Sequence, residues 1–352
     1  MNPMDIRHHP DFDQHEAVEV IQDENLTAMI AVHNSNLGPA VGGCRMYPYA
    51  VPGDAVTDVL RLSRGMTYKS ALAGLPLGGG KSVIIGDPKV AKTKKLLHAM
   101  ADFVNSLEGR YIAAEDSGTS VSDIATMGER TTFVSGVMKD DQFGGDPSPL
   151  TAYGVFVGLR QAVSHHLDRD LASVRVAVQG VGNVGIHLTK MLLQAGAQVI
   201  VADVNPDNVA NAKALGAEVM SPMDIHKADV DVFAPCAMGG AINGSTINEI
   251  RADIVAGAAN NQLASAEMGQ QLFDKGILYA PDYVINAGGI IDVFYQQCGD
   301  RNHDKIADHI DRIGTTLHKI FQTSNQTMLP TNAIADELAE SVFRGQGQQA
   351  VA

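Results

Sequence analysis

Residues 174–203 read VRVAVQGVGNVGIHLTKMLLQAGAQVIVAD and carry the clearest pattern in the chain. It begins with a β-rich run, passes through a glycine-rich turn into a helical pattern, and ends with a second β-rich run, QVIVAD. Strand, helix and strand in this order are typical of two parallel strands joined by a helical crossover. Three further apolar runs, VDVFAPC, DIVAGAA and GILYA, follow as expected buried strands. The second half of the chain is therefore predicted to be a doubly wound parallel sheet.

The turn in this stretch carries the pattern G-x-G-x-x-G, which marks a dinucleotide-binding Rossmann domain when it follows a strand and opens a helix. The first glycine permits a tight turn, the second lets backbone amides approach a pyrophosphate, and the third allows close packing of helix on strand. The candidate cofactor-binding residues of the turn are Gly180, Val181, Gly182, Asn183, Val184 and Gly185.

Asp203 ends the second strand at an offset from the turn where a carboxylate can bind the adenosine ribose hydroxyls. Its charge would repel a 2′-phosphate, and the next residues, Val204, Asn205 and Pro206, supply no arginine to receive one. We therefore expect the cofactor to be NAD rather than NADP.

The first half of the chain also alternates β-rich and helical patterns. EAVEVIQ, LTAMIAVH, KSVIIG and RYIAAED are expected strands, and the segment from about Asp54 to Ala73 is an expected helix. The glycines and prolines of GGDPSP, residues 144–149, interrupt both patterns and are the best domain boundary. The sequence thus predicts an α/β protein with a mostly parallel α/β catalytic domain, a C-terminal Rossmann domain, and a cleft between them.

The expected bounds are 1–146 for the substrate-binding domain and 147–326 for the cofactor-binding domain. An amphipathic helix at about 327–344 is expected to pack back onto the first domain. The tail, residues 345–352, is expected to be disordered.

The composition excludes several classes of protein. With 26 basic and 40 acidic side chains the formal net charge is −14, which would repel nucleic acids and anionic membranes. No apolar run approaches the ~20 residues that span a bilayer. The histidines and the three cysteines, Cys44, Cys236 and Cys298, show no spacing typical of a metal site, so no metal and buried free thiols are expected. We expect a cytoplasmic protein.

Two lysines and one aspartate are the candidate catalytic residues. Lys69 stands in GMTYKSA, Lys81 in LGGGKSVIIGDP, and Asp116 follows the strand-like RYIAA. A glycine-rich segment ending in lysine suggests a phosphate-binding loop, but GGGKS lacks the longer glycine spacing of that loop and leads into a strand instead of a helix. Catalysis is therefore the leading explanation of Lys81.

Several of these motifs together carry a resemblance to a known family. The runs LGPAVGGCRMY, LSRGMTYKSALAGLPLGGGKSVIIGDP, YIAAEDSGT, DPSPLTAYGV, VQGVGNVG, FAPCAMGG, AGAANNQL and YAPDYVINAGG span residues 37–289. The chain resembles the leucine dehydrogenases of the glutamate/leucine/phenylalanine/valine dehydrogenase family. The resemblance implies NAD-dependent oxidative deamination of a branched-chain L-amino acid to a 2-oxo acid and ammonia, reversible, in a homo-oligomer.

The resemblance also implies roles for particular residues. Lys69 would hold the substrate carboxylate, Lys81 would be the general base that activates water, and Asp116 would shuttle protons to and from the substrate amine. The base role requires an unprotonated amine near neutral pH, for which burial and a second lysine nearby are the expected causes. The amino acid would lie in the interdomain cleft, opposite the nicotinamide.

The remaining implied site residues line the substrate or the cofactor. Gly42 and Gly43 would shape the site of Asp116, Asn261 would reach both nicotinamide and substrate, and Thr151 would contact the cofactor. The apolar side-chain pocket would be formed by Val41, Met66, Ala114, Ile290 and Val293.

Each catalytic residue also has an ordinary structural explanation. Lys69 would be a solvated residue on its helix, Lys81 a loop cation near Asp87, and Asp116 a helix N-cap before SGTSVSDIA. Asp146 and Asp292 stand where the leucine enzymes commonly carry asparagine. A phenylalanine or tryptophan dehydrogenase of the same family stays open as an alternative, because one methylene discriminates by only about 1–3 kcal/mol. A non-catalytic NAD-binding regulator is the alternative from another class.

Overall fold

The computed structural model describes residues 6–137, 146–300 and 302–349. The chain forms two compact units. Unit 1 comprises Met1–Asp146, Val293–Arg301 and Ala339–Ala352, and unit 2 comprises Pro147–Asp292 and Asn302–Leu338. The expectation that the second domain runs unbroken to residue 326 is therefore wrong. The division falls inside two helices, where hydrophobic periodicity gives no sign that the chain passes from one unit to the other.

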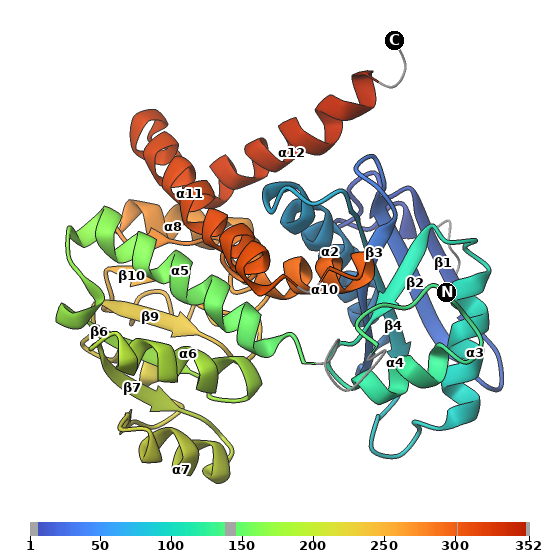
Figure 1. The fold of residues 1–352 in the computed structure, drawn as a ribbon, viewed down its shortest axis with the longest axis horizontal. Helices are drawn as coiled ribbons and strands as arrows, with labels where there is room; N and C mark the ends of the chain where they lie inside the picture. The colour runs from blue at the N-terminus through green and yellow to red at the C-terminus, as the bar shows by residue number, and fades with distance from the viewer. Residues whose placement is uncertain (1–5, 138–145, 301, 350–352) are drawn as a thin grey trace. The chain divides into compact units, whose positions relative to one another are not determined.

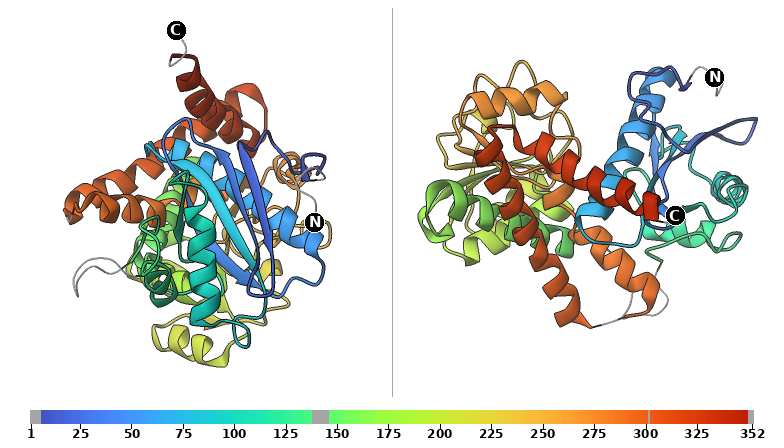
Figure 2. Two further views of the ribbon diagram at one scale, coloured as in Figure 1. Left: turned by 90° about the vertical axis from the view of Figure 1, so that its right-hand side faces the viewer. Right: turned by 90° about the horizontal axis from the view of Figure 1, so that it is seen from above.

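Unit 1 contains a five-stranded sheet in the order β1-β2-β4-β3-β5. Only β2 runs against its neighbours, so the other four strands point the same way, as the mostly parallel prediction requires. Figure 2 shows the strands of this sheet side by side. The strands are β1 (Ala17–Gln22), β2 (Thr27–Asn34), β3 (Ala40–Tyr47), β4 (Gly78–Ile85) and β5 (Tyr111–Ala114).

Helices cover both faces of this sheet (Figure 1). On one face, Val56, Val59 and Leu60 of α2 (Pro52–Leu72) pack against Met29 and Val83. On the other face, α3 (Lys94–Asn105) and α4 (Val121–Met127) contribute Met100, Val104 and Ile124, among other residues, to the larger core cluster. Because side chains alternate along a strand, β1, β2 and β4 contribute residues to both clusters.

β4 begins at Gly78, three residues before its predicted start, so the three glycines belong to the strand and not to a loop. A Cβ atom at Gly79 would lie 2.1 Å from the backbone nitrogen of Thr67 in α2, and one at Gly80 would lie 2.6 Å from the ring of Tyr111. At Gly78 it would lie 2.4 Å from the carbonyl oxygen of Asn34. The glycines therefore let β4 approach its neighbours closely, which a propensity argument does not reveal because isolated glycine disfavours strands.

Unit 2 contains a six-stranded sheet in the order β11-β10-β9-β6-β7-β8, and all its pairs are parallel. The chain runs from β6 outward to β8, then returns to β9 on the other side of β6 and continues outward. This is the strand order of a Rossmann domain. The strands are β6 (Arg175–Gln179), β7 (Gln198–Ala202), β8 (Glu218–Val219), β9 (Val232–Pro235), β10 (Ile254–Val255) and β11 (Leu278–Tyr279).

Helices of unit 2 pack beside this sheet and on one another. α5 (Ser148–Leu167) packs against both α6 (Asn183–Gln194) and α11 (His303–Thr327). The remaining helices described in this unit are α7 (Pro206–Ala214), α8 (Ala266–Asp274) and α9 (Asp282–Ile285), with 3-10 turns η1 (Leu171–Ser173) and η2 (Ile225–Lys227). The doubly wound prediction is confirmed, although the short strand β8 was not expected.

Two helices close the chain, α10 (Gly288–Cys298) and, after α11, α12 (Thr331–Gln349). α12 begins after Pro330 and not at 327, because α11 continues to Thr327 and ends at Met328 in the left-handed conformation. It extends beyond residue 344 into the predicted disordered tail. Glycine weakens a helix by only about 1 kcal/mol and no proline stops this one. Residues 350–352 lie outside the described part of the chain.

The last part of α12 belongs to unit 1. Glu340 accepts a hydrogen bond of 2.7 Å from the hydroxyl of Tyr68, and the Phe343 ring centroid lies 5.3 Å from that of Tyr68. Within the described ranges, no helix is long and apolar enough to cross a membrane.

Substituting Gly79 by alanine should lower stability by at least about 2 kcal/mol, because the added methyl meets the backbone of α2, which cannot move without repacking. The matched control is Gly65→Ala in α2, where a Cβ meets no atom within 4 Å. This control should raise stability by up to about 1 kcal/mol through helix propensity. Thermal unfolding of both variants measures the difference, and equal melting temperatures would contradict the close approach of β4 to α2.

Candidate active site

One face of the unit 1 sheet gathers several of the predicted site residues. β3 pairs with β5 so that Gly43 lies opposite Ala114, and β2 pairs with β4 so that Ala31 lies opposite Lys81. The pairing of Val41 with Gly79 places Gly43 beside Lys81 in the β3–β4 register. Val41, Gly43, Lys81 and Ala114 therefore share the face that α2 covers.

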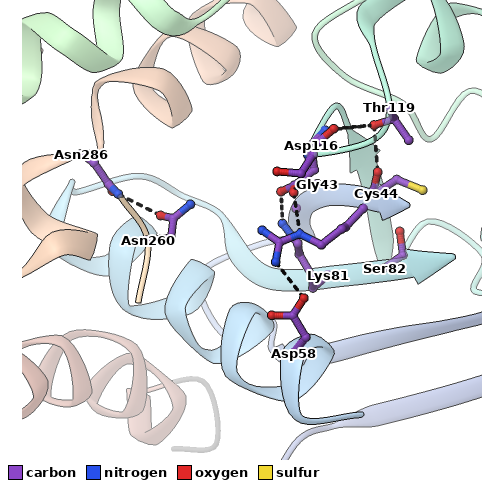
Figure 3. A network of polar contacts seen from close by, with 12 residues as sticks. Gly43, Cys44, Asp58, Lys81, Ser82, Asp116, Thr119, Asn260 and Asn286 are labelled. Atoms are coloured by element: carbon purple, nitrogen blue, oxygen red, sulfur yellow. Dashed lines mark hydrogen bonds and ion pairs between the residues drawn. The ribbon is translucent and has the colours of Figure 1, made fainter. Parts of the chain in front are cut away.

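Lys81 and Asp116 form an ion pair on this face (Figure 3). The Lys81 side chain, from the middle of β4, is 4% exposed, and the Asp116 side chain, just after β5, is 15% exposed. Burial by itself raises the pKa of Asp116, but the positive charges of Lys81 and Arg45 and their hydrogen bonds outweigh it and hold the pKa well below its usual value. Asp116 is therefore an ionised carboxylate bonded to the Lys81 amine.

Gly43 makes room for the Asp116 carboxyl group. A Cβ atom at Gly43 would lie 2.5 Å from Oδ2 of Asp116 and 2.6 Å from its Cβ, so any larger residue would displace the carboxylate. A Cβ at Gly42 would lie 1.7 Å from the carbonyl oxygen of Gly80, which fixes the spacing of β3 and β4. Close packing against Gly80 and Asp116 therefore accounts for glycine at positions 42 and 43.

Sequence reasoning missed a second set of charged residues around Asp116. Arg45 of β3 donates from Nε to Asp116 Oδ1 at 2.9 Å and from Nη1 to Asp58 Oδ2 of α2 at 2.7 Å. The Tyr49 hydroxyl donates to the same Asp58 oxygen at 2.6 Å. β3 was not among the expected strands, so the alternation that places Arg45, two residues after Gly43, on the same face could not be used.

Lys69 and Met66 lie three residues apart on α2 and are half-buried, so they share one side of the helix. Lys69 is in the last turn of α2. Val41 is fully buried.

Ile290 and Val293, the other two predicted pocket residues on a helix, both belong to α10. The division between the two units falls between them, at Asp292 and Val293.

In unit 2 the glycine-rich turn has the geometry that its motif predicts. Gly180 has a φ of +94°, and a Cβ there would lie 2.8 Å from that of Ala237. A Cβ atom at Gly185 would lie 2.0 Å from the carbonyl oxygen of Gly180, so only glycine allows this close packing. Gly182 is the N-cap of α6 and has open space on its Cβ side. Asn183 and Val184 form the first helical turn, whose amides can receive an anion.

Asp203 connects the end of β7 to this turn. Its Oδ2 accepts from the backbone amide of Val181 at 2.8 Å and from Asn208 at 3.2 Å, and its Oδ1 accepts from the amide of Asn205 at 2.8 Å. A carboxylate offers about four acceptor positions. Asp203 can therefore accept at least one further hydrogen bond, from a hydroxyl group.

The other predicted cofactor contacts lie on loops and helix ends of unit 2. The Thr151 hydroxyl donates to the carbonyl oxygen of Pro147 at 3.0 Å, and its oxygen lies 2.5 Å from where Gly289 would carry a Cβ. Asn261 is left-handed, with a φ of +52°, and its carbonyl oxygen accepts from Gly240 at 2.7 Å. Beside it, Asn286 donates to Asn260 at 2.8 Å (Figure 3), a pair that sequence reasoning did not single out.

Comparison with known proteins shows the family. Residues 14–133 match the family model described as Glu/Leu/Phe/Val dehydrogenase, dimerisation domain, and residues 146–335 match Glutamate/Leucine/Phenylalanine/Valine dehydrogenase. The chain belongs to this amino-acid dehydrogenase family. The resemblance seen in the sequence motifs is thereby confirmed.

Relatives in this family are similar over almost their whole length. Leucine dehydrogenase from Geobacillus stearothermophilus is 45% identical over 91% of this chain and 87% of its own. Valine dehydrogenase from Streptomyces coelicolor is 43% identical over 96% of this chain and 95% of its own. The crystal structure of L-tryptophan dehydrogenase from Nostoc punctiforme matches with a TM-score of 0.79 at 42% identity, covering 95% of this chain and 97% of that one.

The ordinary explanations of two catalytic candidates are wrong. Lys81 lies within β4 and bonds to Asp116, so it is not a loop cation near Asp87. Asp116 is not the N-cap of the following helix, because Ser120 caps α4 in a capping box with Asp123.

The three cysteines are free, but only Cys44 is fully buried, and Cys298 is exposed near the end of α10. The expectation of buried thiols is therefore wrong for Cys298. In the described ranges, no group of three His, Cys, Asp or Glu residues could hold a metal ion.

Replacing Asp116 by asparagine should lower the melting temperature at pH 7 by roughly 4–8 °C, because it leaves Lys81 buried without its charge partner. The folded-state pKa of Asp116 is lowered, so its contribution is present above the unfolded value and is lost as the pH falls through the folded value. The gap between wild type and variant should therefore close as the pH falls below about 4.

The matched control for this prediction is Asp102→Asn, which removes a half-exposed partner of Arg130. Its effect should stay near zero at every pH, as for other surface pairs. If Asp116→Asn and Asp102→Asn shift the melting temperature equally, the Lys81–Asp116 pair does not stabilise the fold.

Proposed function

We propose that this protein catalyses the NAD-dependent, reversible oxidative deamination of branched-chain L-amino acids, L-leucine first, to 2-oxo acids and ammonia. The observation that carries the proposal is the buried pair of Lys81 and Asp116 beside Gly43, in a chain whose second unit has a dinucleotide turn. The family of the chain and its similarity to leucine dehydrogenase support it.

Asp116 would exchange protons with the substrate amine. It is an ionised acceptor, held by Lys81 and Arg45, on the side where Gly43 leaves room. Lys69, in the last turn of α2, would bind the substrate carboxylate as a charged partner. A bound nicotinamide would supply the acceptor for the hydride of the substrate Cα atom, and the part of the chain would be to hold the substrate within contact distance of it.

Lys81 would act as the general base for the water that attacks the iminium carbon of the substrate. The neighbour that the structure places beside the Lys81 amine is the carboxylate of Asp116. A substrate ammonium bound at Asp116 would place two cations beside one carboxylate, which favours loss of a proton from one of them. Asp116 would take the proton of the substrate ammonium, and the base role of Lys81 requires that its own proton pass to solvent before the water attacks.

The turn from Gly180 to Gly185 fits a dinucleotide, because Gly182 at the start of α6 carries no side chain and has open space on its Cβ side. We further propose NAD over NADP. Asp203 would accept from the ribose hydroxyls with its remaining capacity, and its carboxylate would repel a 2′-phosphate.

The substrate side chain would be received by Val41, Met66, Ala114, Ile290 and Val293. All five are apolar, so a glutamate side chain would be desolvated there without a partner, at a cost of several kcal/mol. Branched-chain side chains carry no polar group, and each buried methylene contributes about 0.8 kcal/mol. The chain is about as similar to an L-tryptophan dehydrogenase as to a valine dehydrogenase. Aromatic amino acids are therefore the rival substrates.

We also propose that the enzyme works in the cytoplasm as a homo-oligomer. The three free cysteines fit a reducing compartment. The description of the matched N-terminal family model as a dimerisation domain supports association through unit 1.

Lys81→Ala should reduce kcat about 100-fold or more, because it removes the proposed base, while NAD binding in unit 2 stays at the wild-type value. The variant should remain folded, since Arg45 still balances the Asp116 charge. Turnover of L-leucine with NAD and calorimetric NAD binding measure the two effects. Lys94→Ala, which removes a largely exposed partner of Glu129, is the control and should keep wild-type turnover. Wild-type kcat in Lys81→Ala would rule out the base role.

Asp203→Ser should reduce the preference for NAD over NADP by about tenfold or more, because it removes repulsion of the 2′-phosphate and keeps a hydroxyl acceptor for the Val181 amide. The ratio of kcat/KM values for the two cofactors is the measurement. Asp207→Ser, an exposed carboxylate in the first turn of α7, is the control. An unmodified enzyme that uses NADP as well as NAD would show that Asp203 does not select the cofactor.

A further inference from the structure

The two carboxylate oxygens of Asp116 have different partners. Oδ1 accepts from Arg45 Nε at 2.9 Å and from the backbone amide of Ser117 at 2.7 Å. Oδ2 accepts from the Lys81 amine. Two N–H donors occupy Oδ1, so a proton added there would have to displace one of them. Oδ2 is therefore the oxygen at which a proton can be gained or lost beside Lys81.

Arg45 is itself held in place from the far side. Its Nη1 donates to Asp58 Oδ2 of α2 at 2.7 Å, and the Tyr49 hydroxyl donates to the same oxygen at 2.6 Å. The Arg45 and Asp58 side chains are 20% and 22% exposed. The guanidinium thus spans two carboxylates with a planar fork, a geometry that a lysine cannot reproduce.

Further contacts fix the backbone at Asp116 and limit the space around its carboxyl group. Its backbone amide donates to Thr119 Oγ1 at 3.0 Å, and that hydroxyl donates to the carbonyl oxygen of Cys44 on β3 at 2.8 Å (Figure 3). Gly43 packs against the carboxyl group on the sheet side. Exchange of the two oxygens by rotation would break the Arg45, Ser117 and Lys81 contacts together.

We propose that Arg45, anchored by Asp58, is a positioning residue that confines proton exchange to Oδ2 of Asp116. In the step, an N–H bond of the substrate ammonium breaks, its electron pair stays on nitrogen, and an O–H bond forms at Oδ2; reductive amination reverses it. The inference rests on the proposed function for the identity of the proton donor. The placement of Arg45 rests on the contacts alone.

An ordinary surface pair in the same unit shows what sets Arg45 apart. Arg130 Nε bonds to Asp102 Oδ1 at the same 2.9 Å, but both side chains are about half exposed. Arg45 is mostly buried, contacts two carboxylates, and one of these also bonds to Lys81. Equal bond geometry in different surroundings makes Arg130→Gln the matched control for Arg45→Gln.

The other titratable side chains near Asp116 include Cys44, Tyr49, Tyr111 and Glu115. Burial raises the pKa of Cys44 to about 11 and that of Tyr111 well above its usual value, so both stay neutral near pH 7. Burial and the hydrogen bond to Asp58 likewise raise the pKa of Tyr49. Burial and then Asp146 raise the pKa of Glu115, which is next in sequence to Asp116. Lys81 and Arg45 supply the positive charge bonded to Asp116.

The test compares Arg45→Gln, Arg45→Lys and Arg130→Gln in the full-length enzyme. Arg45→Gln should lower kcat for L-leucine about 10- to 100-fold with little change in KM or NAD affinity, and should move the acid limb of the kcat profile to higher pH by about one unit or more. Arg45→Lys should restore the position of the limb but only part of kcat, because it keeps the charge and loses the fork. Arg130→Gln should match the wild type.

A second measurement does not depend on activity. The protonation midpoint of Asp116 is followed by infrared difference spectroscopy in the carboxylic acid region, with Asp116→Asn identifying the band. Arg45→Gln should raise this midpoint by about one pH unit or more, and Arg130→Gln should not. This readout separates the two proposals: a wild type that oxidises no amino acid refutes the proposed function, while the midpoint still decides the role of Arg45.

An Arg45→Gln variant with an unchanged midpoint and an unchanged kcat profile would overturn the proposal. If Arg45→Gln does not fold, Arg45→Lys decides: a kcat lowered at least several-fold with an unmoved acid limb supports positioning, and a wild-type kcat overturns it.

Discussion

The buried ion pair between Lys81 and Asp116 is the interaction on which the candidate active site depends. Two charges taken out of water are costly unless each finds its partner in good geometry. That requirement explains features that look unrelated in the sequence. Gly43 has no side chain because the carboxylate fills its place, and Arg45 supplies a second cation to the same aspartate. The close approach of β4 to α2 and β3, made possible by its glycines, sets the frame in which the pair forms.

In unit 2 as well, a carboxylate fixes the geometry of the candidate site, here the glycine-rich turn. Asp203 is tied to the amide of Val181, so the end of β7 and the turn after β6 are held in one arrangement. The positive φ of Gly180 and the tight contact of Gly185 with the Gly180 carbonyl set where α6 begins, and the first amides of a helix have no partner within it. A carboxylate and a set of free amides in this arrangement suit a ribose and a pyrophosphate.

The sequence predicted most strands, the doubly wound sheet and the dinucleotide turn, because each leaves a local signature in apolar periodicity or glycine spacing. It also predicted Lys81 and Asp116 through motifs that resemble a family. It did not predict that Gly78–Gly80 form strand, since glycine is accepted there only for contacts with Asn34, Thr67 and Tyr111, which are distant in sequence. Arg45 was missed for the same reason: its partner Asp116 is 71 residues away. The passage of α10 and α12 between units likewise leaves no periodic signal.

The proposed function is that of a dehydrogenase for apolar, branched-chain L-amino acids. The most direct measurement incubates the purified enzyme with NAD and a panel of leucine, isoleucine, valine, phenylalanine, tryptophan and glutamate, and records NADH and ammonia together. We expect equal amounts of NADH and ammonia, with the highest kcat/KM for leucine, isoleucine and valine and very little product from glutamate. A preference for glutamate, or NADH without ammonia, would contradict it.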